Sequence, residues 1–117
     1  MYERDFRLYL SDILDSGRAI QEFVKGLSFE EFCKDRKTSS AVIREFEVIG
    51  EAVGKLSDEL KIKHPNVEWQ DIKDFRNLLI HEYFGVDLEI VWRVVQDDLP
   101  ALMDAVNEIL QVRVNNL

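Results

Sequence analysis

Two side chains five residues apart, Arg76 and His81, have types and spacing that suit chemistry on RNA. Arg76, Asn77, His81 and Tyr83 lie in the segment DFRNLLIHEYF. A histidine can move protons near neutral pH, and the planar guanidinium of an arginine can bind and neutralise a phosphate. These two groups could activate the 2′-hydroxyl of RNA against the adjacent phosphate without a metal ion. The segment therefore predicts an anion-handling site and makes RNA cleavage one candidate activity.

The four side chains are expected on one helix, from about residue 69 to residue 83, which Gly85 ends. On a helical wheel its apolar side chains cover an arc about 200° wide, more than one bundle face requires. Such a helix is expected to be covered on two sides, by its own chain and by a partner, which favours a dimer. Arg76 and Tyr83 fall inside this arc, whereas Asn77 and His81 form a more polar stripe. His81 lies in the last turn, where the helix dipole favours the protonated ring.

An arginine in an apolar arc needs an explanation, because an unpaired buried charge is costly. It can form an ion pair, lie at a subunit interface, or line a cleft that receives an anion. Glu45, Glu47 and Glu51 on the preceding long helix are the candidate partners, and an Arg–Glu pair would give Arg76 a purely structural role.

The remaining pattern predicts an all-α fold, an antiparallel four-helix bundle with one short extra helix. Apolar residues recur at steps of three and four, as one helix face requires. We expect a first helix at about residues 3–25, and a short helix at 29–34 behind the capping box of Ser28 and Glu31. Ser39 or Ser40 is expected to cap a second long helix, and Asp87 a fourth. Asp98-Leu99-Pro100 should kink or split that fourth helix. No segment alternates as a strand would.

Two glycines on the second long helix, Gly50 and Gly54, are one turn apart. They predict a close approach, either by another helix of the same bundle or by a second subunit.

Composition limits the function classes. The length predicts one domain, residues 1–117. The formal net charge of −8 argues against passive nucleic-acid binding, although residues 61–83 carry four positive and four negative side chains and are neutral overall. The single Cys33 cannot form an internal disulfide, which is typical of the cytoplasm, and neither a membrane-spanning run nor a signal-peptide core occurs. His81-Glu82 lacks the second histidine that a zinc-binding helix motif requires, and the sequence has no Gly-rich phosphate-binding loop. We therefore expect no metal and no cofactor.

Arg76 to Tyr83 has the spacing R-x4-H-x-Y, and this resembles the signature of HepT-like ribonucleases of the HEPN superfamily. Other segments resemble that family in the same order along the chain: IGEA at 49–52, HPNVEWQDI at 64–72, VDLEIVW at 86–92 and LPAL at 99–102. The resemblance implies a homodimeric toxin that cuts RNA, with Arg76 and His81 as catalytic residues and Asn77 in support. We add Glu51, as a possible partner of Arg76, to the supporting positions.

The resemblance also implies a regulatory partner, a cognate minimal nucleotidyltransferase antitoxin that transfers AMP onto Tyr83. An AMP group there would place negative charge beside Arg76 and repel RNA phosphates. Two alternatives remain open at this point. The chain could be a non-catalytic nucleotide- or substrate-binding subunit of a nucleotidyltransferase, or a helical scaffold in which Arg76 is only structural.

Overall fold

The computed structural model describes residues 5–82 and 85–115, with side chains up to residue 111, and all regular elements in these ranges are helical. This confirms the all-α prediction. The elements in chain order are α1 (Phe6–Val24), α2 (Phe29–Lys34), α3 (Arg36–Lys55), α4 (Asp58–Lys63), α5 (Trp69–His81), α6 (Leu88–Arg93), the π-helical segment η1 (Val94–Asp98) and α7 (Leu99–Asn115).

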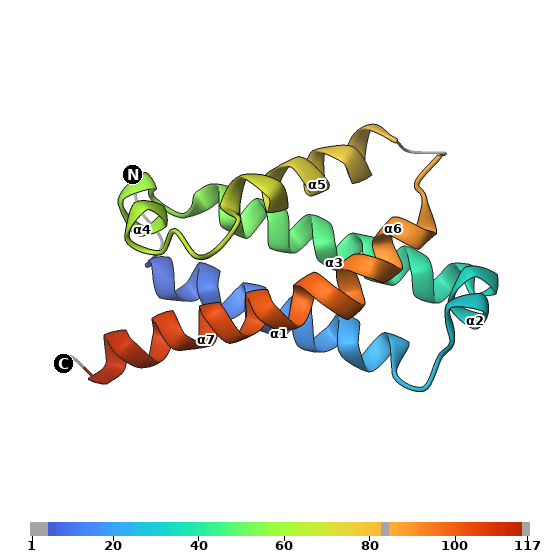
Figure 1. Ribbon diagram of the computed structural model, residues 1–117, viewed down its shortest axis with the longest axis horizontal. Coiled ribbons are helices and arrows are strands. Elements are labelled where there is room, and N and C mark those ends of the chain that lie inside the picture. The colour runs from blue at the N-terminus through green and yellow to red at the C-terminus, as the bar shows by residue number, and fades with distance from the viewer. Residues whose placement is uncertain (1–4, 83–84, 116–117) are drawn as a thin grey trace.

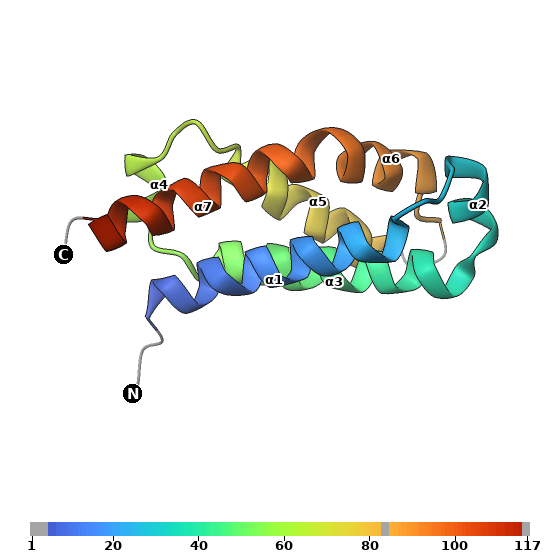
Figure 2. The same cartoon turned by 90° about the horizontal axis from the view of Figure 1, so that it is seen from below.

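The long helices pack as a layer of two with one further helix on each (Figure 1). α1 and α3 lie side by side, α5 packs on α3, and α7 packs on α1. Figure 2 shows α1 and α3 together below α7, with α5 behind. α5 has its main contact with α3 alone, so its placement depends on the surface that α3 offers.

The predicted apolar seams form the core. On α3 the apolar residues at steps of three and four, Val42, Phe46, Ile49 and Val53, are all buried, and on α1 and α7 most residues at such steps are. Fully buried side chains from the seams include those of Leu10, Ile13, Ile20, Val42, Val53 and Val106. Burial of a large aliphatic side chain contributes about 1.5–3 kcal/mol, so these seams hold α1, α3 and α7 together.

The start of α3 differs from the prediction. The helix begins at Arg36 with Asp35 as its N-cap, not at Ser39 or Ser40. The Asp35 carboxylate accepts hydrogen bonds from the Thr38 N–H (3.0 Å) and the Thr38 hydroxyl (2.7 Å). Ser39 is buried inside the helix, and its hydroxyl donates to the carbonyl of Arg36. A carboxylate one turn earlier satisfies the free N–H groups of the helix start, so the serines are not needed as caps.

Two short helices lie next to α3 in the chain, α2 before it and α4 after it. The capping box of Ser28 and Glu31 is present at α2, as predicted, with both reciprocal hydrogen bonds formed. α4 was missed by the sequence prediction. Its signal is the Ser57 side chain, which accepts from the N–H of Leu60, followed by Asp58 and Glu59 in the first turn.

The last long helix changes its winding where the Asp98-Leu99-Pro100 sequence predicts a kink or split. In η1 the N–H of Leu99 donates to the carbonyl of Val94, a bond that spans five residues instead of four. Pro100 has no N–H, so it cannot continue a regular α-helical ladder. The chain adapts with one wide turn and then continues as α7. Within the described ranges, no helix combines the length and hydropathy that crossing a bilayer requires.

Candidate functional site

Helix α5 carries the candidate residues, and aromatic contacts attach it to α3. Trp69 and Leu79 are buried, and the Phe75 ring meets the Phe46 ring of α3 edge-on, with centroids 5.2 Å apart. The Trp69 indole N–H donates to the carbonyl of His64 (3.0 Å) and so attaches the helix start to the preceding loop. His64 itself ends α4.

Gly50 of α3 lies directly beneath Arg76. A Cβ atom added at Gly50 would overlap with both Cβ and Cγ of Arg76. The close approach predicted for Gly50 is therefore made by a helix of the same chain. Nothing lies within 4 Å of the position that a Cβ would take at Gly54, so the prediction of a close approach there is wrong within the described chain.

The Arg76 guanidinium is half-buried and has few partners. Its Nη1 donates to Oδ1 of Asn77 (3.4 Å), while its Nε is buried and has no hydrogen-bond partner among the described residues. Among the residues described, no ion pair joins Arg76 to a glutamate of α3: Glu47 is paired with Arg44 (3.5 Å), and Glu51 is exposed. The predicted Arg–Glu pair is thus not seen in this part of the chain. Arg76 keeps the capacity to bind an anion.

His81 is the last residue of α5 and is exposed, and Asn77 one turn earlier is half-buried. The helix ends two residues before the predicted end at residue 83. The N–H of Glu82, its C-cap, donates to the carbonyl of Leu78. Tyr83, the predicted modification site, lies outside the described residues.

A protein-family model described as "Ribonuclease HepT-like" matches residues 13–109 of this chain. This chain belongs to the HepT-like ribonuclease family. The matched range includes Gly50, Arg76, Asn77 and His81.

Curated relatives cover nearly the whole of this HepT-like chain. A protein of Caldanaerobacter subterraneus named "Putative RNase TTE0752" is 46% identical over 90% of this chain and 94% of its own. "Probable ribonuclease HepT" of Thermococcus cleftensis is 41% identical over 86% of this chain and 91% of its own. "Putative RNase MJ0127" of Methanocaldococcus jannaschii is 41% identical over 95% of this chain and 92% of its own. No solved structure matches significantly.

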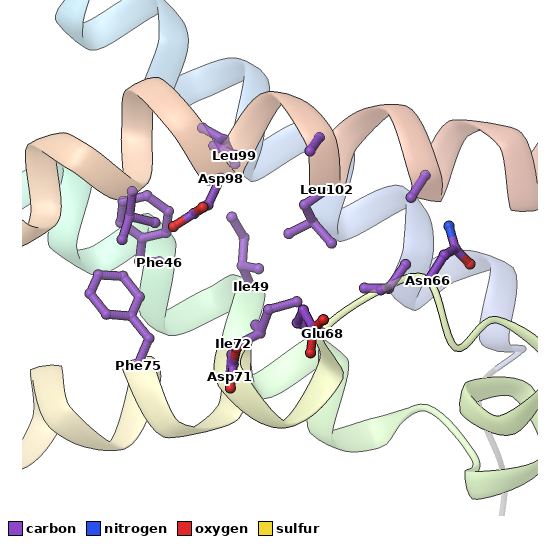
Figure 3. A pocket seen from close by; sticks show the side chains of 14 residues that line it. Phe46, Ile49, Asn66, Glu68, Asp71, Ile72, Phe75, Asp98, Leu99 and Leu102 are labelled. Carbon is purple, nitrogen blue, oxygen red and sulfur yellow. The ribbon is translucent and has the colours of Figure 1, made fainter.

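A groove of about 490 Å³ opens on the other flank of α5, between this helix and the η1–α7 segment. Its floor includes Phe46 and Ile49 of α3. Figure 3 shows carboxylates on both sides, with Asp98 on the η1 side and Glu68 and Asp71 at the start of α5. The other lining residues are Asn66, Val67, Ile72, Phe75, Val94, Leu99, Ala101, Leu102 and Ala105. Neither Arg76 nor His81 lines the groove, and its carboxylates would repel RNA phosphates.

Exposed apolar side chains surround the His81 end of α5. Leu78 is 43% exposed, Ile80 38%, and Ile90 of α6 39%. A smaller hollow of about 210 Å³ lies between α5 and the start of α6 and includes Leu78 and Ile90 in its lining. The wide apolar arc predicted for α5 is therefore real, but α3 covers only part of it.

Among the described residues, no group of three or more histidine, cysteine or carboxylate side chains could hold a metal ion. Sequence reasoning named Arg76, Asn77 and His81 as candidates but did not predict the contact of Gly50 with Arg76. The IGEA segment contained the only signal for that contact, and the partner helix could not be read from it.

Proposed function

We propose that this HepT-like chain is the toxin of a toxin–antitoxin pair and cuts RNA internally without a metal ion. Arg76 binds the scissile phosphate, His81 transfers protons, and Asn77 orients Arg76. The observation that carries this proposal is the state of Arg76: its stem is packed on Gly50, its Nε has no partner, and no described carboxylate neutralises it. A guanidinium in that state is ready for a phosphate.

The proposed reaction is a transesterification. The imidazole of His81 removes the proton of the 2′-hydroxyl, and the 2′-oxygen attacks the adjacent phosphorus. The bond from phosphorus to the 5′-oxygen of the next nucleotide breaks, and that oxygen takes up the proton that the imidazole received in the first step. The products are a 2′,3′-cyclic phosphate and a free 5′-hydroxyl. Arg76 stabilises the negative charge on the phosphate oxygens as it increases in the transition state.

The same proposal includes a homodimer. Arg76 and His81 are five residues apart, which on an ideal helix means about 140° around the axis and about 7.5 Å along it. Two α5 helices facing each other would bring an arginine and a histidine from different copies toward one phosphodiester. The exposed Leu78 and Ile80 on the same helix supply apolar surface for such a contact. In this proposal α1, α3, α5 and the α6–α7 segment form a four-helix bundle, and two bundles dimerise through helix faces.

A cognate nucleotidyltransferase antitoxin completes the proposal. It would transfer AMP from ATP to the Tyr83 hydroxyl, with pyrophosphate as the leaving group. The proposal requires that the added phosphate compete with RNA for the guanidinium of Arg76. Exposed carboxylates give the rest of the chain its negative charge and offer docking sites for a basic partner.

The test is RNA cleavage by the purified protein in the presence of EDTA. We expect products that end in 2′,3′-cyclic phosphate, and loss of cleavage in His81→Ala and Arg76→Ala; His64→Ala, which changes the other histidine, is the control. Co-expression with a minimal nucleotidyltransferase of the proposed antitoxin type should add AMP mass increments that disappear in Tyr83→Phe. Intact RNA under all these conditions, with nucleotide still bound, would favour the non-catalytic subunit instead.

The dimer has a separate test with a matched pair of variants. Ile80→Glu should shift the light-scattering mass from dimer toward monomer and reduce cleavage, because a charge would enter the proposed apolar contact. Ile62→Glu makes the same change at a side chain of α4 that is 76% exposed, and it should alter neither. A monomeric wild type, or an Ile80→Glu dimer with full activity, contradicts this part of the proposal.

A further inference from the structure

Gly50 of α3 and Arg76 of α5 are in close contact. The atoms of Arg76 that a Gly50 side chain would meet are its Cβ and Cγ, at the root of the side chain. Cβ is fixed to the backbone of α5, so a change of rotamer cannot move it away. A side chain at position 50 can therefore be accommodated only if α5 shifts as a whole.

The partner atoms show what this close fit achieves. With its stem packed on α3, Arg76 has its Nε buried without a hydrogen-bond partner in the described ranges, and its terminal Nη1 donates to Asn77. A buried donor that makes no hydrogen bond costs free energy, so the fold maintains Arg76 in an unfavourable resting state. Such groups are found at functional sites, where a ligand supplies the missing interaction.

We propose that Gly50 is a positioning residue for the nuclease reaction. Because it lacks a side chain, it sets the distance between α3 and α5 and thereby the position of the Arg76 guanidinium. The inference rests on the proposed role of Arg76 in binding phosphate. It assigns to Gly50 no contact with RNA, only control over where Arg76 lies.

Gly54 provides a matched control within the same helix. It lies one turn from Gly50, as the last residue but one of α3, and no atom of the described residues stands within 4 Å of the Cβ position there. Alanine in place of a helical glycine favours the helix at both positions, and the gain is smaller at Gly54 because it lies in the last turn. The difference between the two variants therefore isolates the contact with Arg76.

The experiment compares RNA cleavage and thermal unfolding of wild type, Gly50→Ala and Gly54→Ala. Misplacement of a catalytic group by about 1 Å can cost about 100-fold in rate, so we expect a fall of that order in kcat for Gly50→Ala. Its KM should change much less, because the remaining RNA contacts stay. Gly54→Ala should keep wild-type kcat and melt at a higher temperature. A folded Gly50→Ala protein with the kcat of Gly54→Ala overturns the proposal.

A double-mutant cycle keeps the proposal testable even when Gly50→Ala folds poorly. Arg76→Gly removes both Cβ and Cγ, so Gly50→Ala should destabilise the wild-type background but not the Arg76→Gly background. Equal destabilisation in both backgrounds would show that Gly50 does not serve Arg76. Full activity of Arg76→Ala would instead refute the assigned role of Arg76, and the melting cycle would still report on the Gly50–Arg76 fit.

Discussion

The two flanks of α5 differ in how closely they are packed. On one flank Gly50 lets the helix approach α3 until the stem of Arg76 rests on the α3 backbone. On the other flank Ile72 and Phe75 line an open groove of about 490 Å³ that separates α5 from η1 and α7. The close flank carries the residue with proposed chemistry, whereas the open flank carries apolar side chains and a rim of carboxylates.

This difference shows how a small helical chain can hold one group accurately without packing a whole helix tightly. Interiors packed at crystal-like density transmit a displacement of even one methyl group. An open groove absorbs such changes, because added atoms have space to occupy. We therefore expect substitutions on the close flank to change activity, and substitutions on the open flank to change mainly stability.

The largest expected effect comes from Arg76→Lys, which should move activity and stability in opposite directions. Lysine keeps the charge but loses the planar fork, so we expect cleavage to fall about 10²–10³-fold. The same change replaces the buried, unpartnered Nε with a methylene group, which should stabilise the fold by about 1 kcal/mol.

Cleavage rates and urea unfolding of the same preparations measure both effects. Arg93→Lys is the control, since Arg93 is an exposed residue of α6 in an i,i+4 ion pair with Glu89, and it should change neither quantity. A less stable Arg76→Lys protein would mean that Nε has a partner in solution, and the close flank would then be an ordinary structural contact.

Sequence periodicity was sufficient to place the long helices and most of the core, because burial on one helix face imposes its own spacing. The α2 capping box and the Asp87 cap were also predicted, since caps depend on neighbouring residues only. The prediction of Ser39 or Ser40 as the N-cap of α3 was wrong. Asp35 and both serines are suitable N-cap residues, and only the folded chain decides between them.

The candidate site was predictable in its residue types but not in its surroundings. Arg76 inside an apolar arc signalled a special position, yet the wheel could not choose between an ion pair, an interface and a cleft. That choice depends on which α3 residue faces Arg76, and the answer, Gly50 rather than a glutamate, is a tertiary contact. Val94 and Asp98 of η1 line the groove, and a periodicity of 3.6 residues does not anticipate the π turn to which they belong.

A second prediction compares the two kinds of packing directly with one substitution, alanine to leucine. Ala105 of α7 lines the groove, so Ala105→Leu has space and should stabilise the fold by about 0.5–2 kcal/mol. Ala52 of α3 is 5% exposed within the core, so Ala52→Leu should cost about 1–3 kcal/mol.

Chemical denaturation of the two variants tests this contrast, and RNA cleavage by Ala105→Leu should remain at the wild-type level. If Ala105→Leu destabilises the protein as much as Ala52→Leu, the groove is filled in solution, and the open flank is a second close contact.

The smallest expected effect concerns the start of α3, the helix on which the close flank is built. Hydrogen bonds from the Thr38 hydroxyl and then from its N–H hold the pKa of Asp35 below its usual range. A carboxyl group with a lowered pKa in the folded state contributes stability above its unfolded pKa, about 3.8, and loses it as the pH falls through the lower folded value.

Asp35→Asn keeps a capping oxygen but removes this titration, so the drop in melting temperature between pH 7 and pH 3 should be smaller than in wild type. Asp104→Asn, at an exposed position of α7, should leave the drop unchanged; an equal drop in wild type and Asp35→Asn would mean that α3 does not depend on the ionised cap.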